Sequence, residues 1–278
     1  MDVRAWLLER RPAVDAMLQQ WLPETTTPPS SLHGAMRHLV FPGGKRFRPG
    51  LALAAAEAVG GPHQAALPMA AAVELVHVYS LIHDDLPCMD DDHERRGQPT
   101  VHVAWDESTA VLAGDALQSL AFEGLLRHTE PTLGAGAALD LATAIGAGGL
   151  VGGQVDDLVQ SREPGDESFV LGIHQRKTAC LIEASVVGGA RLAGASLEWL
   201  SELACFGSEV GVAFQIADDC LDEGEDDESC SLVTLLGREA CLDRAESLLD
   251  SALRRIEGMG EEAEPLRALA RFSVGRDA

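Results

Sequence analysis

The stretch "ALPMAAAVELVHVYSLIHDD", residues 66–85, is apolar on nearly every side before it ends on two aspartates. A helix that is hydrophobic all round lies buried inside a protein, so we expect this one at the centre of the fold. Most other apolar residues of the chain are Ala, Leu and Val, and aromatic residues make up only 4%. Because Ala and Leu are strong helix formers, the composition favours an all-α protein.

Helical patterns continue outward from this segment in both directions. We expect the first helix, residues 5–22, to be interrupted near Pro12, because proline disrupts a helix interior. We expect residues 134–159 and 169–194 to form one helix each. No strand-type alternation, linker or short repeat is visible, so the sequence predicts a single domain over residues 1–278 with about ten or more helices. The expected helices cover residues 5–22, 31–41, 48–59, 66–85, 107–126, 134–159, 169–194 and 197–223, with two more after residue 235.

The overall charge narrows the classes of function. The formal net charge is -23, which argues against binding nucleic acid, since that depends on positive surface. No run of about 20 uninterrupted apolar residues is present, so we expect no membrane span. The first residues contain no signal peptide pattern, and the six cysteines are scattered without a C-x-x-C pair. We therefore expect a cytoplasmic protein with free thiols.

The central helix runs directly into a first cluster of carboxylates. Asp84 and Asp85 fall in its last turn, where the helix dipole disfavours negative charge, and Asp90 follows six residues after Asp84. Desolvated carboxylates cost several kcal/mol unless they are neutralised. A solvated acidic loop would explain the charges, but the helix before them is too apolar to be surface.

A second cluster, "FQIADDCLDE", also follows an apolar helix. Asp218 and Asp222 are spaced i,i+4 and share one helix face, while Asp219 points aside. A fraying helix end would explain this cluster taken alone. Two such clusters, each at the end of a buried helix, together provide oxygen ligands suited to magnesium, which prefers carboxylates, water and phosphate.

Basic residues stand beside glycine and aspartate motifs although the chain contains only 21 Lys and Arg. Exposed ion pairs contribute little to stability, so this placement indicates anion sites more than surface pairing. The groups are Lys45, Arg46 and Arg48 in "GGKRFRP", Arg95 and Arg96 in "ERRGQPT", and Arg176, Lys177 and Thr178 in "HQRKTACL".

Taken together, these segments resemble the trans-isoprenyl diphosphate synthase family. The matching segments, in order, are "GGKRFRP", "SLIHDDLPCMDDDHERRGQPTVH", "LAGDAL", "GGQVDDL", "KTACLIEAS" and "FQIADDCLD". The resemblance is strong over residues 30–222 and closest to bacterial farnesyl diphosphate synthases, whose first motif carries the same two extra residues. It implies a helical bundle around a deep central cavity, a homodimer, and the joining of isopentenyl diphosphate to an allylic diphosphate.

The resemblance also implies roles for individual residues. Several Mg²⁺ ions, with Mn²⁺ as a substitute, would be held by Asp84 and Asp90, with Asp85 in support, and from the opposite wall by Asp218 and Asp222. The catalytic residues would be Asp84, Asp90, Lys177 and Asp218. The allylic diphosphate would be bound by Arg95, Lys177, Thr178 and Gln215. The diphosphate of isopentenyl diphosphate would be bound by Lys45, Arg48, His77 and Arg96.

Product length is expected to depend on Tyr79 and Ser80, which precede the first motif. Tyr79 lies five residues before Asp84, about 1.4 helical turns deeper. In enzymes that resemble this chain, an aromatic ring there goes with a C15 product, so we expect farnesyl diphosphate, with C20 as the alternative. Simple core packing of Tyr79 is equally compatible with its position.

The chain departs from the family pattern after Asp222. Lysines expected there are missing, and the segment "EGEDDESCSLVTLLG" carries Glu225, Asp226, Asp227 and Glu228 in their place, with Ser229 and Ser231 roughly where Lys and Thr would stand. Two alternatives therefore accompany an active prenyltransferase. One is a weakly active or regulatory subunit of a heteromeric synthase, and the other is a related enzyme that ionises allylic diphosphates.

Overall fold

The computed structural model describes residues 1–278 except 42, 161–164, 222–230 and 276–278. Its α-helices are α1 (Val3–Trp21), α2 (Ser30–Val40), α3 (Phe47–Ala58), α4 (Leu67–Asp84), α5 (Val101–Ala104), α6 (Glu107–Arg127), α7 (Pro131–Ile145), α8 (Leu150–Gln160), α9 (Glu167–Ile173), α10 (Cys180–Leu192), α11 (Leu197–Leu221), α12 (Leu232–Leu236), α13 (Arg238–Arg255) and α14 (Glu264–Val274). Short turns of 3₁₀-helix precede α4 (η1, His63–Ala66) and α14 (η3, Glu261–Ala263), and a π-helical segment (η2, His174–Ala179) joins α9 to α10.

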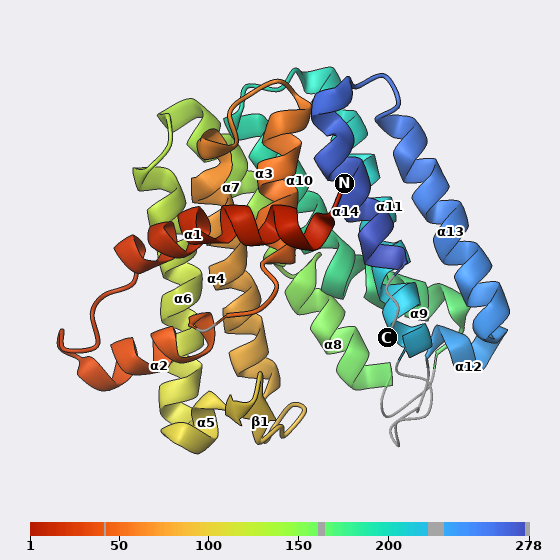
Figure 1. The fold of residues 1–278 in the computed structure, drawn as a ribbon. Helices are drawn as coiled ribbons and strands as arrows, with labels where there is room; N and C mark the ends of the chain where they lie inside the picture. Colours follow the sequence, from red (N-terminus) through yellow and green to blue (C-terminus); the bar gives the residue numbers. More distant parts are fainter. Residues whose placement is uncertain (42, 161–164, 222–230, 276–278) are drawn as a thin grey trace.

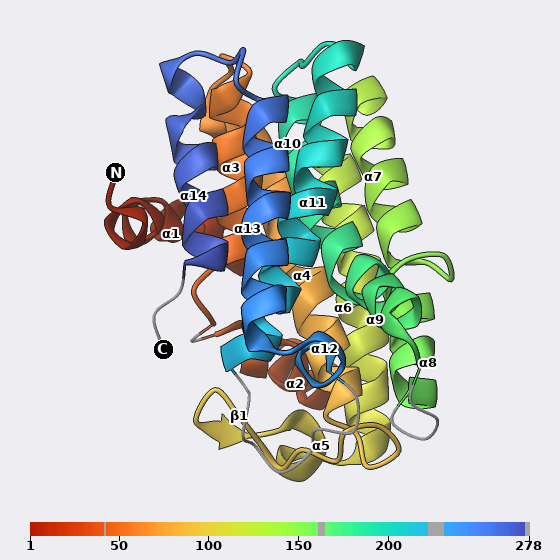
Figure 2. The ribbon, with the colours of Figure 1, turned by 90° about the vertical axis from the view of Figure 1, so that its right-hand side faces the viewer.

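The long helices stand side by side as a bundle, and α1 lies across one face of it (Figure 1). Helix α4 packs between α3 and α6, while α10 and α11 pack against each other, and α13 covers α11. The strand β1 (Glu94–Arg95), which follows α4 in the chain, and α12, which follows α11, lie at the same end of the bundle (Figure 2). The all-α prediction is confirmed.

The central position of α4 follows from its composition. Twelve of its 18 residues are buried, and most of them join a core with side chains from α1, α3, α6, α10 and α14. We therefore propose that the chain is a single domain. The one charged residue on α4 before its end, Glu74, is buried and accepts a hydrogen bond of 2.5 Å from Arg46. A buried charge without a partner is costly, and this pairing removes that cost.

Two expected helix boundaries were wrong. Helix α1 continues through Pro12, because Trp6, Val14 and Leu18 are buried on both sides of it, and such packing outweighs the cost of proline in a helix, about 3 kcal/mol. The segment 134–159 is not one helix but divides into α7 and α8 around Gly146–Gly149. Glycine loses more conformational freedom in a helix than other residues, so a run of them breaks easily.

Two further features were not anticipated. The expected helix 169–194 is a continuous helical path from Glu167 to Leu192, but its middle is π-helical. A two-stranded antiparallel hairpin, β1 (Glu94–Arg95) with β2 (Gln98–Pro99), follows the first acidic motif. Its turn contains Arg96 and Gly97, which both have positive φ, a conformation that glycine adopts without steric cost.

Two segments, His63–Asp84 and Pro131–Val159, would be long and apolar enough to cross a membrane by length and composition alone. The first contains α4, and 78% of its most apolar window is buried inside the protein; for the second the share is 44%. The core helix of a protein without any membrane segment passes the same test, so this is weak evidence for a span.

Candidate functional site

The first acidic motif is folded back on itself by the backbone. Asp84 is the last residue of α4 and Asp85 caps it. The backbone N–H of Asp90 donates to the carbonyl of Asp84 at 2.8 Å, and that of Asp91 donates to Leu86 at 3.2 Å. The six-residue spacing therefore closes into a turn, and it brings Asp90 back beside Asp84.

The surroundings of Asp84 disfavour the ionised form of its carboxyl group. Burial raises its pKa to about 6; the positive charge of Lys177 opposes this rise, and the negative charge of Asp90 adds to it. The pKa of Asp90 is raised as well, first by burial, again against the charge of Lys177. A site that disfavours its own carboxylates in this way is stabilised by any cation that binds there.

Asp85 has a different environment from Asp84. Its side chain is buried and pairs with Arg95, whose guanidinium also pairs with Asp92. The second carboxylate oxygen of Asp85 is buried without a hydrogen-bond partner. Burial raises the pKa of Asp85, and Arg95 opposes that shift. The arginine expected to bind substrate is thus held on the first motif by two carboxylates.

The facing wall is formed by η2 and α8. The ammonium of Lys177 donates to Asp157 at 2.6 Å, and Arg176 pairs with Asp156. A Cβ on Gly153 would lie 2.3 Å from the backbone nitrogen of Lys177, so α8 approaches η2 this closely only because Gly153 has no side chain. Irregular π-helical turns frequently mark functional sites, and this one presents Lys177 and Thr178 together.

Asp157 was not assigned a role from the sequence, although the segment "GGQVDDL" had been singled out. Its charge and hydrogen bond raise the pKa of Lys177 against the effect of burial, and Asp84 and Asp90 act in the same direction. Lys177 therefore lies within electrostatic reach of three carboxylates from two walls. The paired aspartates of that segment were the signal that could have identified Asp157.

The third wall is α11. The hydroxyl of Thr178 donates to the side-chain oxygen of Gln215 at 2.9 Å, and the amide of Gln215 donates to Asp219 at 3.1 Å. Asp219 also lies 3.1 Å from the ring of His174, so its carboxylate is engaged by two side chains of this wall and of η2. These side chains line a cavity of about 170 Å³ with Asp157 and Lys177.

Asp218 lies in the last turn of α11, and its meeting with the first motif stays a prediction. Asp222 and the acidic segment with Ser229 lie outside the described residues. The deep central cavity likewise stays a prediction.

A second group of expected site residues gathers around His77. Burial lowers the pKa of His77, followed by the charges of Arg48, Arg96, Arg95 and Arg46. Arg96 lies 3.4 Å from Nε2 of His77 and donates to the carbonyl of Leu39 at 2.9 Å. The sequence prediction that Arg48, His77 and Arg96 belong together is therefore consistent with this electrostatic grouping.

The glycine-rich loop lies against this basic group. A Cβ on Gly44 would lie 3.1 Å from the guanidinium of Arg96, so the backbone of the loop comes close to that cation. Lys45 is exposed on the loop and lines a cavity of about 570 Å³ with Gly43 and Gly44. Arg46 takes a structural part, since it donates to Asp15, Glu74 and the carbonyl of Val40 and so ties α1, α4 and α2 together.

The two residues expected to influence product length lie on α4. The ring of Tyr79 is buried and meets the ring of His83 edge-on, with centroids 5.8 Å apart. Burial raises the pKa of Tyr79, and the negative charge of Asp84 adds to this rise. Gln118 lies near enough to oppose the rise, although its geometry does not make a hydrogen bond to the hydroxyl. The hydroxyl of Ser80 donates to the carbonyl of His77 at 2.9 Å.

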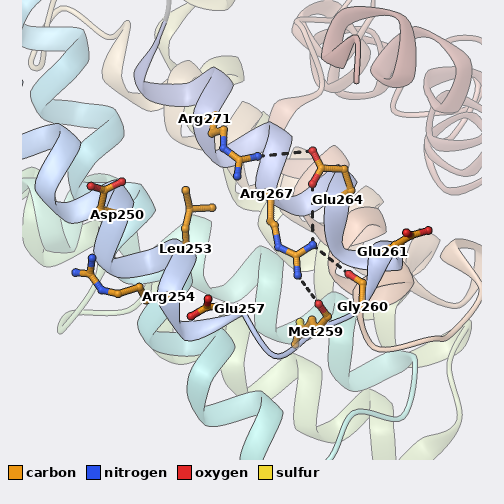
Figure 3. Close-up of a pocket in the computed structure, with 10 residues that line it drawn as sticks. All are labelled: Asp250, Leu253, Arg254, Glu257, Met259, Gly260, Glu261, Glu264, Arg267 and Arg271. Carbon is orange, nitrogen blue, oxygen red and sulfur yellow. Dashed lines mark hydrogen bonds and ion pairs between the residues drawn. The ribbon is translucent and has the colours of Figure 1, made fainter.

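The largest of the hollows described, about 1100 Å³, lies between α13 and α14 and contains none of the expected site residues (Figure 3). Arg267 donates to the carbonyl of Gly260 at 3.0 Å, and Arg271 lies 3.6 Å from Glu264. These cations are engaged with the protein itself, so the chemistry of the acidic and basic groups lies elsewhere.

Comparisons with known proteins found matches that cover most of the chain. A family model described as polyprenyl synthetase matches residues 29–243. A geranylfarnesyl diphosphate synthase of Leucosceptrum canum is 40% identical over 99% of this chain and 81% of its own length. A geranylgeranyl pyrophosphate synthase of Arabidopsis thaliana is also 40% identical, over 99% and 84%. The crystal structure of an FPP/GFPP synthase from Zymomonas mobilis superposes with a TM-score of 0.91 at 38% identity, covering 99% of both chains.

Proposed function

The chain belongs to the polyprenyl synthetase family, and we propose that it elongates an allylic diphosphate to C15 farnesyl diphosphate. It is a prenyltransferase whose substrates are isoprenyl diphosphates. The observation that supports a reaction site at this position is the environment of Lys177. Its charge opposes the raised pKa values of Asp84 and Asp90 while its ammonium is bonded to Asp157 on the facing wall.

Members of this family use a divalent metal, and we assign Mg²⁺ to the acidic groups. Asp84 and Asp90 would hold it from one side, with Asp85 in support, and Asp218 and Asp222 from the other. The donor set fits, because Mg²⁺ takes oxygen ligands from a few carboxylates and the phosphates of a substrate. The raised pKa of Asp84 and the unpartnered buried oxygen of Asp85 both favour a cation there. When bound, the metal supplies charge neutralisation for the diphosphate.

Lys177, Arg95, Thr178 and Gln215 are assigned to the allylic diphosphate. When the allylic C–O bond breaks, negative charge accumulates on the diphosphate oxygens, and fixed hydrogen-bond donors stabilise it. Lys177 donates from η2, where its bond to Asp157 already holds the ammonium in place. The hydroxyl of Thr178 donates its one proton to Gln215 at 2.9 Å and so orients the amide of Gln215, whose second N–H is left to donate to the diphosphate.

Lys45, Arg48, His77 and Arg96 are assigned to the diphosphate of isopentenyl diphosphate. The lowered pKa of His77 keeps its ring neutral near pH 7, so it donates through one nitrogen without adding a charge. The cations supply charge, and Arg96 offers a planar fork that matches phosphate oxygens. The second substrate is thus held by the chain's own cations, and its double bond faces the allylic carbon.

The apolar helices complete the reaction environment. An allylic carbocation is captured by water as readily as by a double bond, so the site must exclude bulk water. Helix α4 presents buried side chains such as Tyr79 and Ile82 along the last turns before Asp84. The carbocation is therefore formed next to a hydrophobic wall on one side and fixed charges on the other.

Tyr79 supports a C15 product. Its ring is 4% exposed and packed on His83, directly before the first motif, where it would block a growing prenyl tail. The names of the relatives support C20 as a second candidate, since one of the two at 40% identity is a geranylgeranyl pyrophosphate synthase.

We further propose that Mn²⁺ substitutes for Mg²⁺, that the protein is a homodimer whose interface includes α6, and that it is cytoplasmic.

Product analysis tests this proposal. Purified protein is incubated with Mg²⁺, isopentenyl diphosphate and dimethylallyl, geranyl or farnesyl diphosphate in turn, and products are identified by mass. We expect C15 from the first two primers and no elongation of the third. Elongation of farnesyl diphosphate would establish C20 instead. Absence of elongation with every primer would favour the regulatory subunit or the related ionising enzyme.

Shortening the side chain at position 79 tests the control of length. Tyr79→Ala removes the ring and opens space deeper along α4, so we expect longer products from the same primers. Tyr79→Phe keeps the ring and is the matched control, for which we expect the wild-type products. If both variants give the wild-type distribution, Tyr79 serves only core packing.

A further inference from the structure

Three metal-ligating side chains lie together beyond the carboxylates already assigned. Asp91, His93 and His102 each offer a ligand atom, and these atoms all lie within 4.8 Å of one another. Ligand atoms around a tetrahedral Zn²⁺ with bonds of about 2.0–2.1 Å stand roughly 3.3 Å apart. Asp91 and His93 are exposed and His102 is half-buried, so rotations of exposed side chains suffice to close the remaining distance.

The hairpin folds the chain back so that His102 lies beside His93. His93 comes directly before β1, and the backbone N–H of Thr100, which follows β2, donates to the carbonyl of His93 at 3.1 Å. His102 follows two residues later, and the two imidazole rings lie with centroids 5.9 Å apart at 43°. Such a tilt leaves the rings unstacked, which lets two ring nitrogens converge on one point.

The tautomer of His102 is set by Thr100. The buried hydroxyl of Thr100 donates its one proton to the carbonyl of Asp92 at 2.8 Å. It can therefore only accept from Nδ1 of His102, which lies 3.2 Å away. With the proton on Nδ1, the lone pair is on Nε2, the arrangement that metal-binding histidines adopt when a second group holds the other nitrogen.

The neighbouring charges leave Asp91 uncommitted. Asp92 and Asp85 share Arg95. Among the described residues, the carboxylate of Asp91 and the ring nitrogens of His93 make no ion pair or hydrogen bond. The nearby excess of carboxylates attracts cations.

We propose that Asp91, His93 and His102 form a second metal site for a borderline first-row divalent cation such as Zn²⁺. Imidazole nitrogens suit Zn²⁺, Ni²⁺ and Cu²⁺, whereas Mg²⁺ prefers oxygen ligands alone. The site is therefore distinct in chemistry from the carboxylates around Asp84. Because Asp91 directly follows Asp90, an ion here ties the turn of the first acidic motif to the hairpin that carries Arg95 and Arg96.

Zn²⁺ binding in excess Mg²⁺ tests this site. Millimolar Mg²⁺ occupies the oxygen sites, and Zn²⁺ is titrated against a chromophoric chelator of known affinity. We expect a single tight Zn²⁺ per wild-type chain, and a loss of affinity of more than tenfold in His93→Gln and in His102→Gln, since even outer partners of a ligand contribute 10–100-fold. His63→Gln, on η1 away from the hairpin, and Asp84→Asn are the controls and should bind as the wild type does.

Co²⁺ gives an independent signature of the same ligands. In excess Mg²⁺, we expect visible absorption bands from nitrogen-ligated Co²⁺ in the wild type and their loss in His93→Gln. His93 is exposed, so metal-free His93→Gln should melt at the wild-type temperature, which separates lost binding from lost folding. Wild-type Zn²⁺ affinity in His93→Gln, no tight Zn²⁺ in the wild type, or loss of Zn²⁺ in Asp84→Asn alone would overturn the proposal.

Discussion

The two groups of cations in this protein are surrounded in opposite ways. Around the first acidic motif the cations are bonded to carboxylates: Lys177 to Asp157, Arg176 to Asp156, and Arg95 to both Asp85 and Asp92. Around His77 the charges of four arginines converge. Of these, Arg46 is bonded to Asp15 and Glu74, whereas Arg96 donates to the carbonyl of Leu39.

This difference indicates two ways of binding a diphosphate. Around the first acidic motif the carboxylates outnumber the cations, so the site repels an anion until bound divalent ions make its net charge positive. At the basic group the charges of four arginines add to the effect of burial in lowering the pKa of His77. The field there is already positive, so an anion is attracted without a metal. The predictions below test that contrast, from the largest expected effect to the smallest.

Removing one of the carboxylates assigned to the metal should have the largest effect on the rate of elongation. Asp84→Ala and Asp218→Ala each delete an assigned metal ligand, so we expect elongation to fall by about a thousandfold or more. Initial rates with saturating substrates and Mg²⁺ measure it. Asp243→Ala, at an exposed position of α13, is the control and should keep its activity. Normal activity in either ligand variant would refute the metal assignment.

Chelation of divalent metal should separate the two sites. With excess chelator, we expect binding of an unreactive allylic diphosphate analogue to become undetectable by calorimetry. Binding of isopentenyl diphosphate should persist within about tenfold, because arginines rather than metal ions hold it. Equal loss at both sites would show that the basic group also depends on metal, and the contrast would fail.

A cation of the basic group should affect only one substrate. Arg96→Gln removes the charge beside His77, so we expect KM for isopentenyl diphosphate to rise about 10–100-fold, the loss of one charge-assisted contact of roughly 1.5–3 kcal/mol. KM for the allylic substrate should change little. Arg127→Gln, an exposed surface pair with Glu123, is the matched control. A rise in both KM values would place Arg96 between the sites.

The smallest effect concerns stability without metal. The pKa of Asp84 is raised from 3.8 to about 6 by burial first, so the folded state disfavours the ionised carboxylate. Stability from this group is present below about pH 4 and is lost as the pH rises through 6. Asp84→Asn should therefore unfold with about 1–2 kcal/mol more free energy than the wild type at pH 8 in chelator, and with an equal value near pH 4.

Urea unfolding at the two pH values measures that difference. The comparison is between variant and wild type at each pH, so other titrating groups cancel. Added Mg²⁺ should stabilise the wild type at pH 8 and leave Asp84→Asn nearly unchanged, because a ligand stabilises the state that binds it. If Asp84→Asn is less stable than the wild type at pH 8, Lys177 outweighs the desolvation of Asp84.

Helix positions followed from the sequence wherever an apolar pattern was continuous. The segment 66–85 was identified as a central helix because almost every side is apolar, and α4 matches it closely. Pro12 and the glycines at 146–149 were misjudged, because a helix persists or breaks according to what packs on either side. The hairpin at 94–99 was missed, since strands of two residues have no visible alternation.

The candidate site divides in the same way. The residue types, spacing and order determined that two acidic motifs and three groups of cations were present, and the family followed from them. Which cation meets which carboxylate depended on the π-helical turn and on Gly153, because both set how closely α8 approaches η2. The sequence by itself therefore determined which carboxylates and cations are present, because these are properties of the side chains. The tertiary structure decided the pairing of Lys177 with Asp157 and the burial that raises the pKa of Asp84, because distances between residues far apart in sequence exist only after packing. The meeting of Asp91, His93 and His102 was decided by the hairpin, which the sequence pattern did not reveal.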